Sequence, residues 1–144
     1  MSLPTPNDRG AYRHFQVIPT RWMDNDVYGH VNNVIYYSYF DTVVNAFLID
    51  KGVLDIAMSK VIGLVVETAC NYFSSLAFPQ QVVAGLRVAH LGKSSVRYEI
   101  GLFAEDSRVA AAQGHFVHVY IDRATQQPVS LPLPLRQLLE SITA

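Results

Sequence analysis

The sequence of 144 residues contains one cysteine, no long apolar run and no excess of either charge. A lone Cys70 excludes a disulfide framework within the chain and a metal cluster built on cysteines. The formal net charge of −1 gives no reason to expect nucleic acid or an anionic membrane as a partner. The most apolar runs, such as residues 61–66, are far too short to cross a bilayer. We therefore expect a cytoplasmic protein that binds no metal.

Half of the residues are apolar, which excludes a disordered chain, and the length suits one domain with a core of its own. Residues 1–11 are polar and contain prolines, and they lack the apolar segment of a signal peptide. We expect this segment to be a loose tail on a single domain that spans residues 1–144.

Residues 33–51 have the pattern of one long helix, and Gly52 is its stop signal. Four polar residues spaced i, i+3, i+4 and i+7 form a narrow stripe: Ser38, Asp41, Thr42 and Asn45. Apolar residues fill nearly all other positions. A helix this apolar must be covered on most of its circumference. The pattern predicts that a sheet curls around the helix or that a second subunit helps to cover it.

The rest of the chain has strand patterns. A first strand is expected within residues 12–22, and Pro19 limits its late pairing to a sheet edge. Four more strands are expected within residues 61–73, 81–91, 96–102 and 108–121, followed by a short amphipathic helix over residues 132–142. One long helix followed by strands that tight turns connect predicts an α+β domain with a largely antiparallel sheet.

A polar stretch, residues 21–33, leads directly into the long helix. It places Asp24, Asp26, Gly29 and His30 close to the helix start. The first N–H groups of a helix lack intrahelical partners and lie at the positive end of the macrodipole, so a carbonyl or an anion can bind there. This stretch is a candidate catalytic site, and the alternative is a polar turn with an asparagine cap.

The run D-x-D-x-x-G-H-V-N-N, from Asp24 to Asn33, resembles the hotdog-fold acyl-CoA thioesterases of the 4-hydroxybenzoyl-CoA thioesterase family. Tyr36 and the pair Phe40-Asp41 agree with it, as does the G-x-S-S segment within residues 91–96. The resemblance covers about residues 13–122. It implies an antiparallel sheet wrapped around one central helix, in a homodimer or a dimer of dimers. The site would lie at the dimer interface, with coenzyme A present as part of the substrate and no cofactor.

In this resemblance Asp26 matches the catalytic carboxylate. It would attack the thioester carbonyl or act as a general base on water, and the alternative is a turn residue that accepts backbone N–H bonds. Gly29 would allow an unusual backbone conformation or a close approach to the acyl group. Amides near Asn32 and Asn33 are candidates for the oxyanion site. Asp24 is expected to be structural.

Two residues have alternative roles in the resemblance. His30 either ties the loop together by hydrogen bonds or transfers a proton. Asn33 stands where some relatives carry tyrosine or histidine. It can still orient a water molecule or the thioester, but the departure argues against 4-hydroxybenzoyl-CoA itself as the substrate.

Lys93, Ser94 and Ser95 match the region where relatives bind the phosphates of coenzyme A, and the alternative is a solvated hairpin turn. Glu67 lies in an otherwise apolar strand, where it either faces the interfacial pocket and binds substrate or pairs with an arginine. We expect minor roles for further residues: Arg87 and Arg97 add positive charge, and His90, His115 and His118 are strand residues without a metal.

The sequence thus favours an acyl-CoA thioesterase and leaves two alternatives. One is hydrolysis of acyl groups held on acyl carrier protein. The other is a non-catalytic module that binds acyl-CoA, against which the presence of Asp26 argues.

Overall fold

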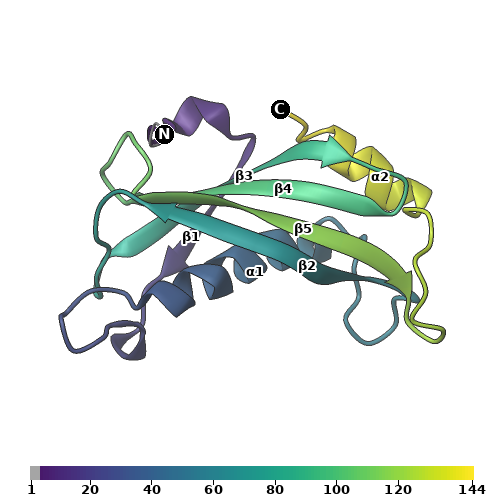
Figure 1. Ribbon diagram of the computed structural model, residues 1–144, viewed down its shortest axis with the longest axis horizontal. Coiled ribbons are helices and arrows are strands. Elements are labelled where there is room, and N and C mark those ends of the chain that lie inside the picture. Colours follow the sequence, from purple (N-terminus) through teal and green to yellow (C-terminus); the bar gives the residue numbers. More distant parts are fainter. Residues whose placement is uncertain (1–3) are drawn as a thin grey trace.

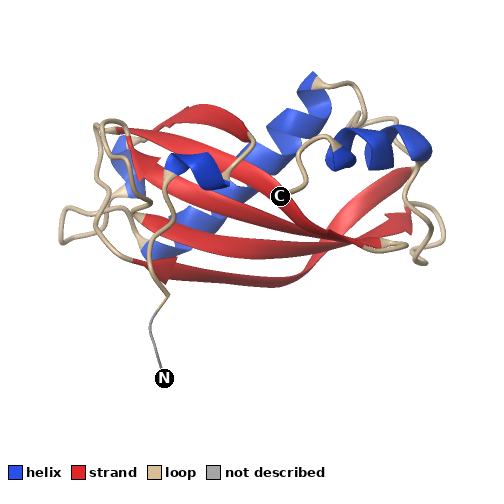
Figure 2. Ribbon diagram, turned by 90° about the horizontal axis from the view of Figure 1, so that it is seen from above, coloured by secondary structure: helices blue, strands red, loops and turns tan. Residues whose placement is uncertain are grey.

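The computed structural model describes residues 4–144 and contains one five-stranded antiparallel sheet. The strands β1 (His14–Pro19), β2 (Val61–Tyr72), β3 (Gln81–Leu91), β4 (Ser95–Ala104) and β5 (Ala112–Asp122) are arranged in the order β1-β3-β4-β5-β2. The long helix α1 (Asn33–Asp50) crosses one face of this twisted sheet (Figure 1, Figure 2). The predicted α+β fold, a sheet around one long helix, is confirmed.

Helix α1 begins and ends where the sequence predicts. The side chain of Asn32 accepts a hydrogen bond from the N–H of Val34 at 3.2 Å and caps the helix, and Gly52 has a φ of +78° just beyond its end. Seven of its apolar residues are buried: Tyr36, Tyr39, Phe40, Val43, Val44, Phe47 and Leu48. Val34 and Ile49 are exposed, so a single chain covers the helix incompletely.

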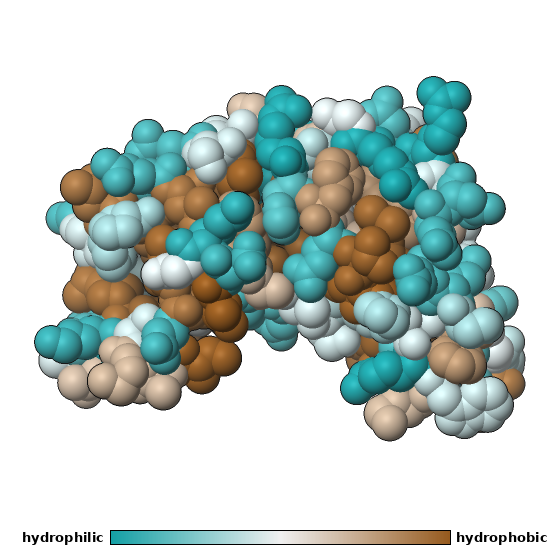
Figure 3. Space-filling model, turned by 180° about the vertical axis from the view of Figure 1, so that it is seen from behind, coloured by the Kyte–Doolittle hydropathy of each residue, from teal (hydrophilic) through white to brown (hydrophobic). Residues whose placement is uncertain are grey.

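Strand alternation separates the two faces of the sheet. In β4, Val96, Tyr98, Ile100 and Leu102 are fully buried in the core that includes α1. Arg97 and Glu99 alternate with them and therefore lie on the outer face, away from α1. Seen from behind, apolar surface is exposed in several places that polar side chains separate (Figure 3). A hollow of about 540 Å³ lies between β1 and the second half of α1.

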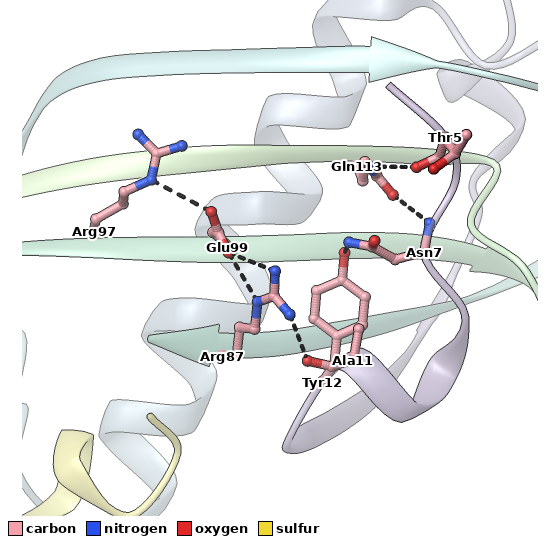
Figure 4. A network of polar contacts seen from close by, with 8 residues as sticks. All are labelled: Thr5, Asn7, Ala11, Tyr12, Arg87, Arg97, Glu99 and Gln113. Carbon is pink, nitrogen blue, oxygen red and sulfur yellow. Dashed lines mark hydrogen bonds and ion pairs between the residues drawn. The ribbon is translucent and has the colours of Figure 1, made fainter. Parts of the chain in front are cut away.

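The N-terminal segment is bound to the outer face, so the prediction of a loose tail is wrong for residues 7–11; residues 1–3 lie outside the described part. The N–H of Asn7 donates to Gln113 at 2.7 Å, and the guanidinium of Arg9 donates to the carbonyl of Ser107 at 2.9 Å (Figure 4 shows the first of these). Tyr12 is buried because Gly101 leaves room for it: a Cβ there would lie 2.5 Å from its ring.

The two edges of the sheet differ. On the β3 side, the end of the chain, which follows helix α2 (Leu133–Glu140), forms a short parallel pairing with β3. The carbonyl of Ile142 accepts a hydrogen bond from the N–H of Val88 at 2.9 Å. Strand β2 at the other edge has no partner on its outer side within residues 4–144, and Leu64, Val65 and Val66 are 43 to 59% exposed there. Long apolar edges of this kind are sites of strand pairing with another chain. In the described chain, none of the helices has both the length and the apolar character that crossing a membrane requires.

Candidate active site

Backbone hydrogen bonds close the loop before α1 on itself. The N–H of Asn32 donates to the carbonyl of Asp24 at 2.8 Å, and the N–H of Asp26 donates to the carbonyl of His30 at 2.9 Å. Between them Gly29 has a φ of +79°, a conformation that residues with a Cβ rarely adopt. The loop therefore needs glycine at this position for its positive φ. This conformation allows the chain to turn back to the start of the helix within a few residues.

Asp26 lies at the mouth of this loop between two hollows. A hollow of about 410 Å³ is bordered by Asp26, His30, Val31, Asn33, Tyr36, Tyr72, Phe73, Ser74 and Ser75. A neighbouring hollow of about 420 Å³ is bordered by Trp22, Asn25, Asp26, Val27 and Gly29. Oδ1 of Asp26 accepts a hydrogen bond from the N–H of Tyr28 at 2.9 Å, as in a turn, whereas Oδ2 has no partner in the described chain. One carboxylate oxygen is therefore available to a bound molecule.

The start of α1 supplies a hydrogen-bond donor that is available to a molecule bound beside Asp26. The N–H of Val34 is bonded to the Asn32 side chain at 3.2 Å, and that of Ile35 to the Asn32 carbonyl at 2.9 Å. Within residues 4–144 the N–H of Asn33 has no acceptor, and Asn33 borders the same hollow as Asp26. This amide lies at the positive end of the helix dipole, so it suits an oxygen on which negative charge develops.

The structure brings His30 and Asn33 together with Asp26, but their side chains make no hydrogen bonds within the described residues. His30 contributes to the loop through its carbonyl, which accepts the bond from Asp26. The imidazole of His30 and the amide of Asn33 are both exposed. Both are free to contact a bound molecule.

Tyr36 of the motif and several residues that the sequence did not single out complete the hollow: Tyr72, Phe73, Ser74 and Ser75. The hydroxyl of Tyr72 donates to the carbonyl of Asn33 at 3.4 Å, and the rings of Tyr36 and Tyr72 pack edge to face at 4.9 Å. Burial raises the pKa of both tyrosines, which therefore remain neutral phenols at neutral pH. Burial also raises the pKa of Cys70 to about 11, so this nearby thiol is no thiolate nucleophile.

Glu67 lies apart from this hollow. A bulge shifts the register of β2 after Val65: Val65 pairs with the buried His118, whereas Glu67 pairs with Val117 on the outer face. There its carboxylate lies 2.5 Å from Nε2 of His115. Glu67 therefore pairs with a histidine instead of an arginine, and it does not line the hollow of Asp26 in its own protomer.

Lys93, Ser94 and Ser95 lie at the other end of the sheet. Ser95 pairs with Val119 on β5, whereas Tyr72 beside the hollow pairs with Ala112. Seven residues of strand separate these positions, about 23 Å at about 3.3 Å per residue. One protomer therefore does not bring the predicted phosphate-binding residues to Asp26.

Arg87 and Arg97 share a carboxylate on the outer face of the sheet. Arg87 forms an ion pair of 2.7 Å with Glu99 on the outer face, and Arg97 contacts the same carboxylate at 3.4 Å (Figure 4). Among residues 4–144, no three histidine, cysteine or acidic side chains are grouped to hold a metal ion.

Comparison with known proteins identifies the family. A model of the thioesterase-like superfamily matches residues 20–139, which includes the loop, α1 and all strands after it. The chain belongs to the thioesterase-like superfamily. The specific 4-hydroxybenzoyl-CoA family is a finer assignment that this match leaves open. Membership supports a thioester hydrolase. A search of curated proteins found no match.

Several solved structures have the same fold as this chain. The PA5185 protein of Pseudomonas aeruginosa is 54% identical, with a TM-score of 0.95 over 97% of this chain and 98% of that one. PA2801, a thioesterase candidate from the same organism, is 29% identical, with a TM-score of 0.81 over 86% and 95% of the two chains. A 1,4-dihydroxy-2-naphthoyl-CoA thioesterase from Synechocystis is 13% identical and shares the fold, with a TM-score of 0.79 over 87% and 93%.

Proposed function

We propose that this member of the superfamily hydrolyses the thioester of an acyl-CoA to a free acid and coenzyme A. The observation that carries the proposal is the placement of a free Asp26 carboxylate oxygen and the free Asn33 amide around one hollow. The Asn33 N–H would donate to the thioester carbonyl and stabilise the oxyanion, and the helix dipole would add to this. Asp26 would supply the base or nucleophile.

Two routes fit this placement. In one, Asp26 takes a proton from water, the oxygen adds to the carbonyl carbon, and the C–S bond breaks to release the thiolate, which the proton then neutralises. In the other, Asp26 attacks the carbon and expels the thiolate, and water then hydrolyses the mixed anhydride. Both give an acid and a thiol.

Coenzyme A as the leaving group rests on a proposed homodimer. β2 runs from the Lys93 end of the sheet towards the Asp26 end. Two β2 edges that pair antiparallel about a two-fold axis would bring the partner subunit's Lys93 end beside the Asp26 end of this chain. The exposed apolar residues of β2 support this pairing. Lys93, Ser94 and Ser95 would then bind phosphate oxygens of the substrate in the partner's site.

Two proteins of the same fold, from Synechocystis and Staphylococcus aureus, are named as thioesterases of CoA thioesters, which supports the choice of carrier. The competing function is a non-catalytic module that binds acyl-CoA. The bond from the Tyr28 N–H to Asp26 favours it, because that bond alone explains an aspartate at this turn.

Substitution of Asp26 separates these functions. We expect Asp26→Asn to lower hydrolysis of the best acyl-CoA by about 10²–10⁴-fold, the effect typical for loss of a positioned base, with a non-hydrolysable analogue still bound. The assay is thiol release across short, medium, long and aromatic acyl-CoAs.

Asp55→Asn is the matched control. Asp55 also accepts backbone N–H bonds in an exposed turn, from Ala57 at 3.0 Å and Met58 at 3.1 Å, but borders neither hollow of Asp26. It should retain wild-type activity. A folded Asp26→Asn protein that hydrolyses its best substrate at the wild-type rate would leave binding as the function.

A further inference from the structure

The first aspartate of the loop has surroundings unlike those of Asp26. Asp24 is fully buried, and its Oδ2 accepts hydrogen bonds from the Tyr39 hydroxyl at 2.7 Å and the Arg21 N–H at 2.9 Å. Its Oδ1 accepts from Nε of Arg21 at 2.9 Å, and Nη2 of Arg21 lies equally close. Burial alone raises the pKa of Asp24, but these bonds and the charge of Arg21 outweigh it and leave the pKa below its ordinary value. Asp24 is thus a fully bonded carboxylate, and it borders neither hollow.

The backbone of Asp24 connects this buried carboxylate to both groups of the proposed reaction. Its carbonyl holds the N–H of Asn32 at 2.8 Å, and Asn32 precedes the free amide of Asn33. Asp26 follows Asp24 by two residues. Any movement of Asp24 therefore moves both groups.

Tyr39 connects the same carboxylate to the body of α1. It lies in the second turn of the helix and is 3% exposed, and its ring contacts that of Tyr36, which borders the hollow. Among the described residues its hydroxyl is the only side-chain group of α1 that bonds to Asp24. This hydrogen bond therefore connects the helix that carries Asn33 to the loop that carries Asp26.

We propose that Tyr39, Asp24 and Arg21 are positioning residues that hold Asp26 and the Asn33 amide at the separation that thioester hydrolysis needs. The proposal rests on the proposed function of this site. Its physical reason is that the rate depends steeply on the placement of reacting groups: a displacement of about 1 Å can cost about 10²-fold. None of the three borders the hollow of Asp26 and Asn33, so they act through their neighbours.

The test is Tyr39→Phe, which removes one hydroxyl and keeps the ring in the core. Asp24 keeps its bonds to Arg21, so the protein should fold. We expect kcat for acyl-CoA hydrolysis to fall about 10- to 100-fold, with KM within about twofold of wild type. Tyr98→Phe is the matched control: it also removes a buried hydroxyl with a 2.7 Å bond, here to Tyr120, and should leave kcat unchanged.

A double-mutant cycle with Asp26→Asn distinguishes positioning from general damage. If Tyr39 acts through Asp26, Tyr39→Phe should change the residual rate of Asp26→Asn by less than about twofold. An equal loss in both backgrounds, or a wild-type kcat in Tyr39→Phe alone, would overturn the positioning role. A wild-type rate in Asp26→Asn would instead refute the proposed function itself.

Arg21→Lys is a second variant in case Tyr39→Phe does not fold. The Arg21 side chain is 58% exposed, so the change is tolerable, and lysine keeps the charge but loses the two-nitrogen contact with Asp24. It should also lower kcat, and it should likewise have little effect on the residual rate in the Asp26→Asn background. A wild-type kcat would count against the proposal.

Discussion

His118 should make the stability of the fold sensitive to mild acid. It lies on β5 beside the edge strand β2 and is 3% exposed, and within residues 4–144 neither ring nitrogen has a hydrogen-bond partner. Its neighbours are the rings of Tyr98, Phe116 and Tyr120, with centroids 4.8 to 6.0 Å away, and a Cβ on Gly63 would come within 2.8 Å of Nδ1. Burial lowers the pKa of His118 from 6.5 to about 4.

The sign and size of the effect follow from linkage. Between pH 6.5 and 4 the unfolded chain binds a proton at this position that the folded chain excludes, so the free energy of unfolding falls as the pH falls. One pKa unit corresponds to about 1.4 kcal/mol, so the loss from pH 7 should be about 2 kcal/mol at pH 5 and about 3 kcal/mol at pH 4. Only well above pH 6.5 is the histidine neutral in both states, and there it contributes no slope.

Comparison with His118→Leu isolates this term, because all other titrating groups are common to both proteins. Urea unfolding of each at pH 7, 6 and 5, at one protein concentration, should show a wild-type loss that exceeds the variant's by about 2 kcal/mol between pH 7 and 5. Leucine should not destabilise at pH 7, since it removes buried nitrogens without partners. Parallel pH dependences of the two proteins would refute the reasoning.

The remaining predictions concern the proposed dimer and its substrate. Val66→Lys places a charge on the exposed edge of β2, so it should shift the protein from dimer towards monomer in sedimentation at micromolar concentration and should abolish hydrolysis. A fully active monomer would contradict a shared site. Lys93→Ala should raise KM for acyl-CoA about 10-fold with little change in kcat, and should leave KM for an acyl-pantetheine unchanged; equal losses on both substrates would indicate a structural role.

Local patterns predicted the helix and the loop well because their causes are local. Asn32 and Gly52 delimit α1 within one residue of the expected range, and Gly29 has a positive φ, which is the first of the two roles expected for it. From Ser95 to Ile100 the buried and half-buried residues of β4 alternate as expected, but the alternation ends there because Gly101 and Phe103 are buried against Tyr12 of the N-terminal segment. Each correctly predicted feature depends on residues within a few positions in the chain.

Features that depend on strand register or distant packing were missed. The bulge after Val65 turns Glu67 to the outer face, and the sequence carries no signal for that one-residue shift. Tyr72 and Ser74 border the hollow because β2 pairs with β5 beside the start of α1, a contact between segments nearly forty residues apart. The anchoring of residues 7–11 did leave a trace, namely the strand glycines Gly85 and Gly101, which make room for Tyr12.

The two aspartates of the motif are two residues apart, but their surroundings and their proposed roles differ. The short turn η2 (Trp22–Asp24) directs the first carboxylate inward, where Arg21 and Tyr39 satisfy it and hold it charged. The chain then extends, and the second carboxylate, on Asp26, reaches the surface with one oxygen free. A buried charge without such partners would cost several kcal/mol, so the arginine and tyrosine are needed before the loop can have this shape. In the proposed mechanism, the chemistry of Asp26 would therefore depend on residues that do not border its hollow.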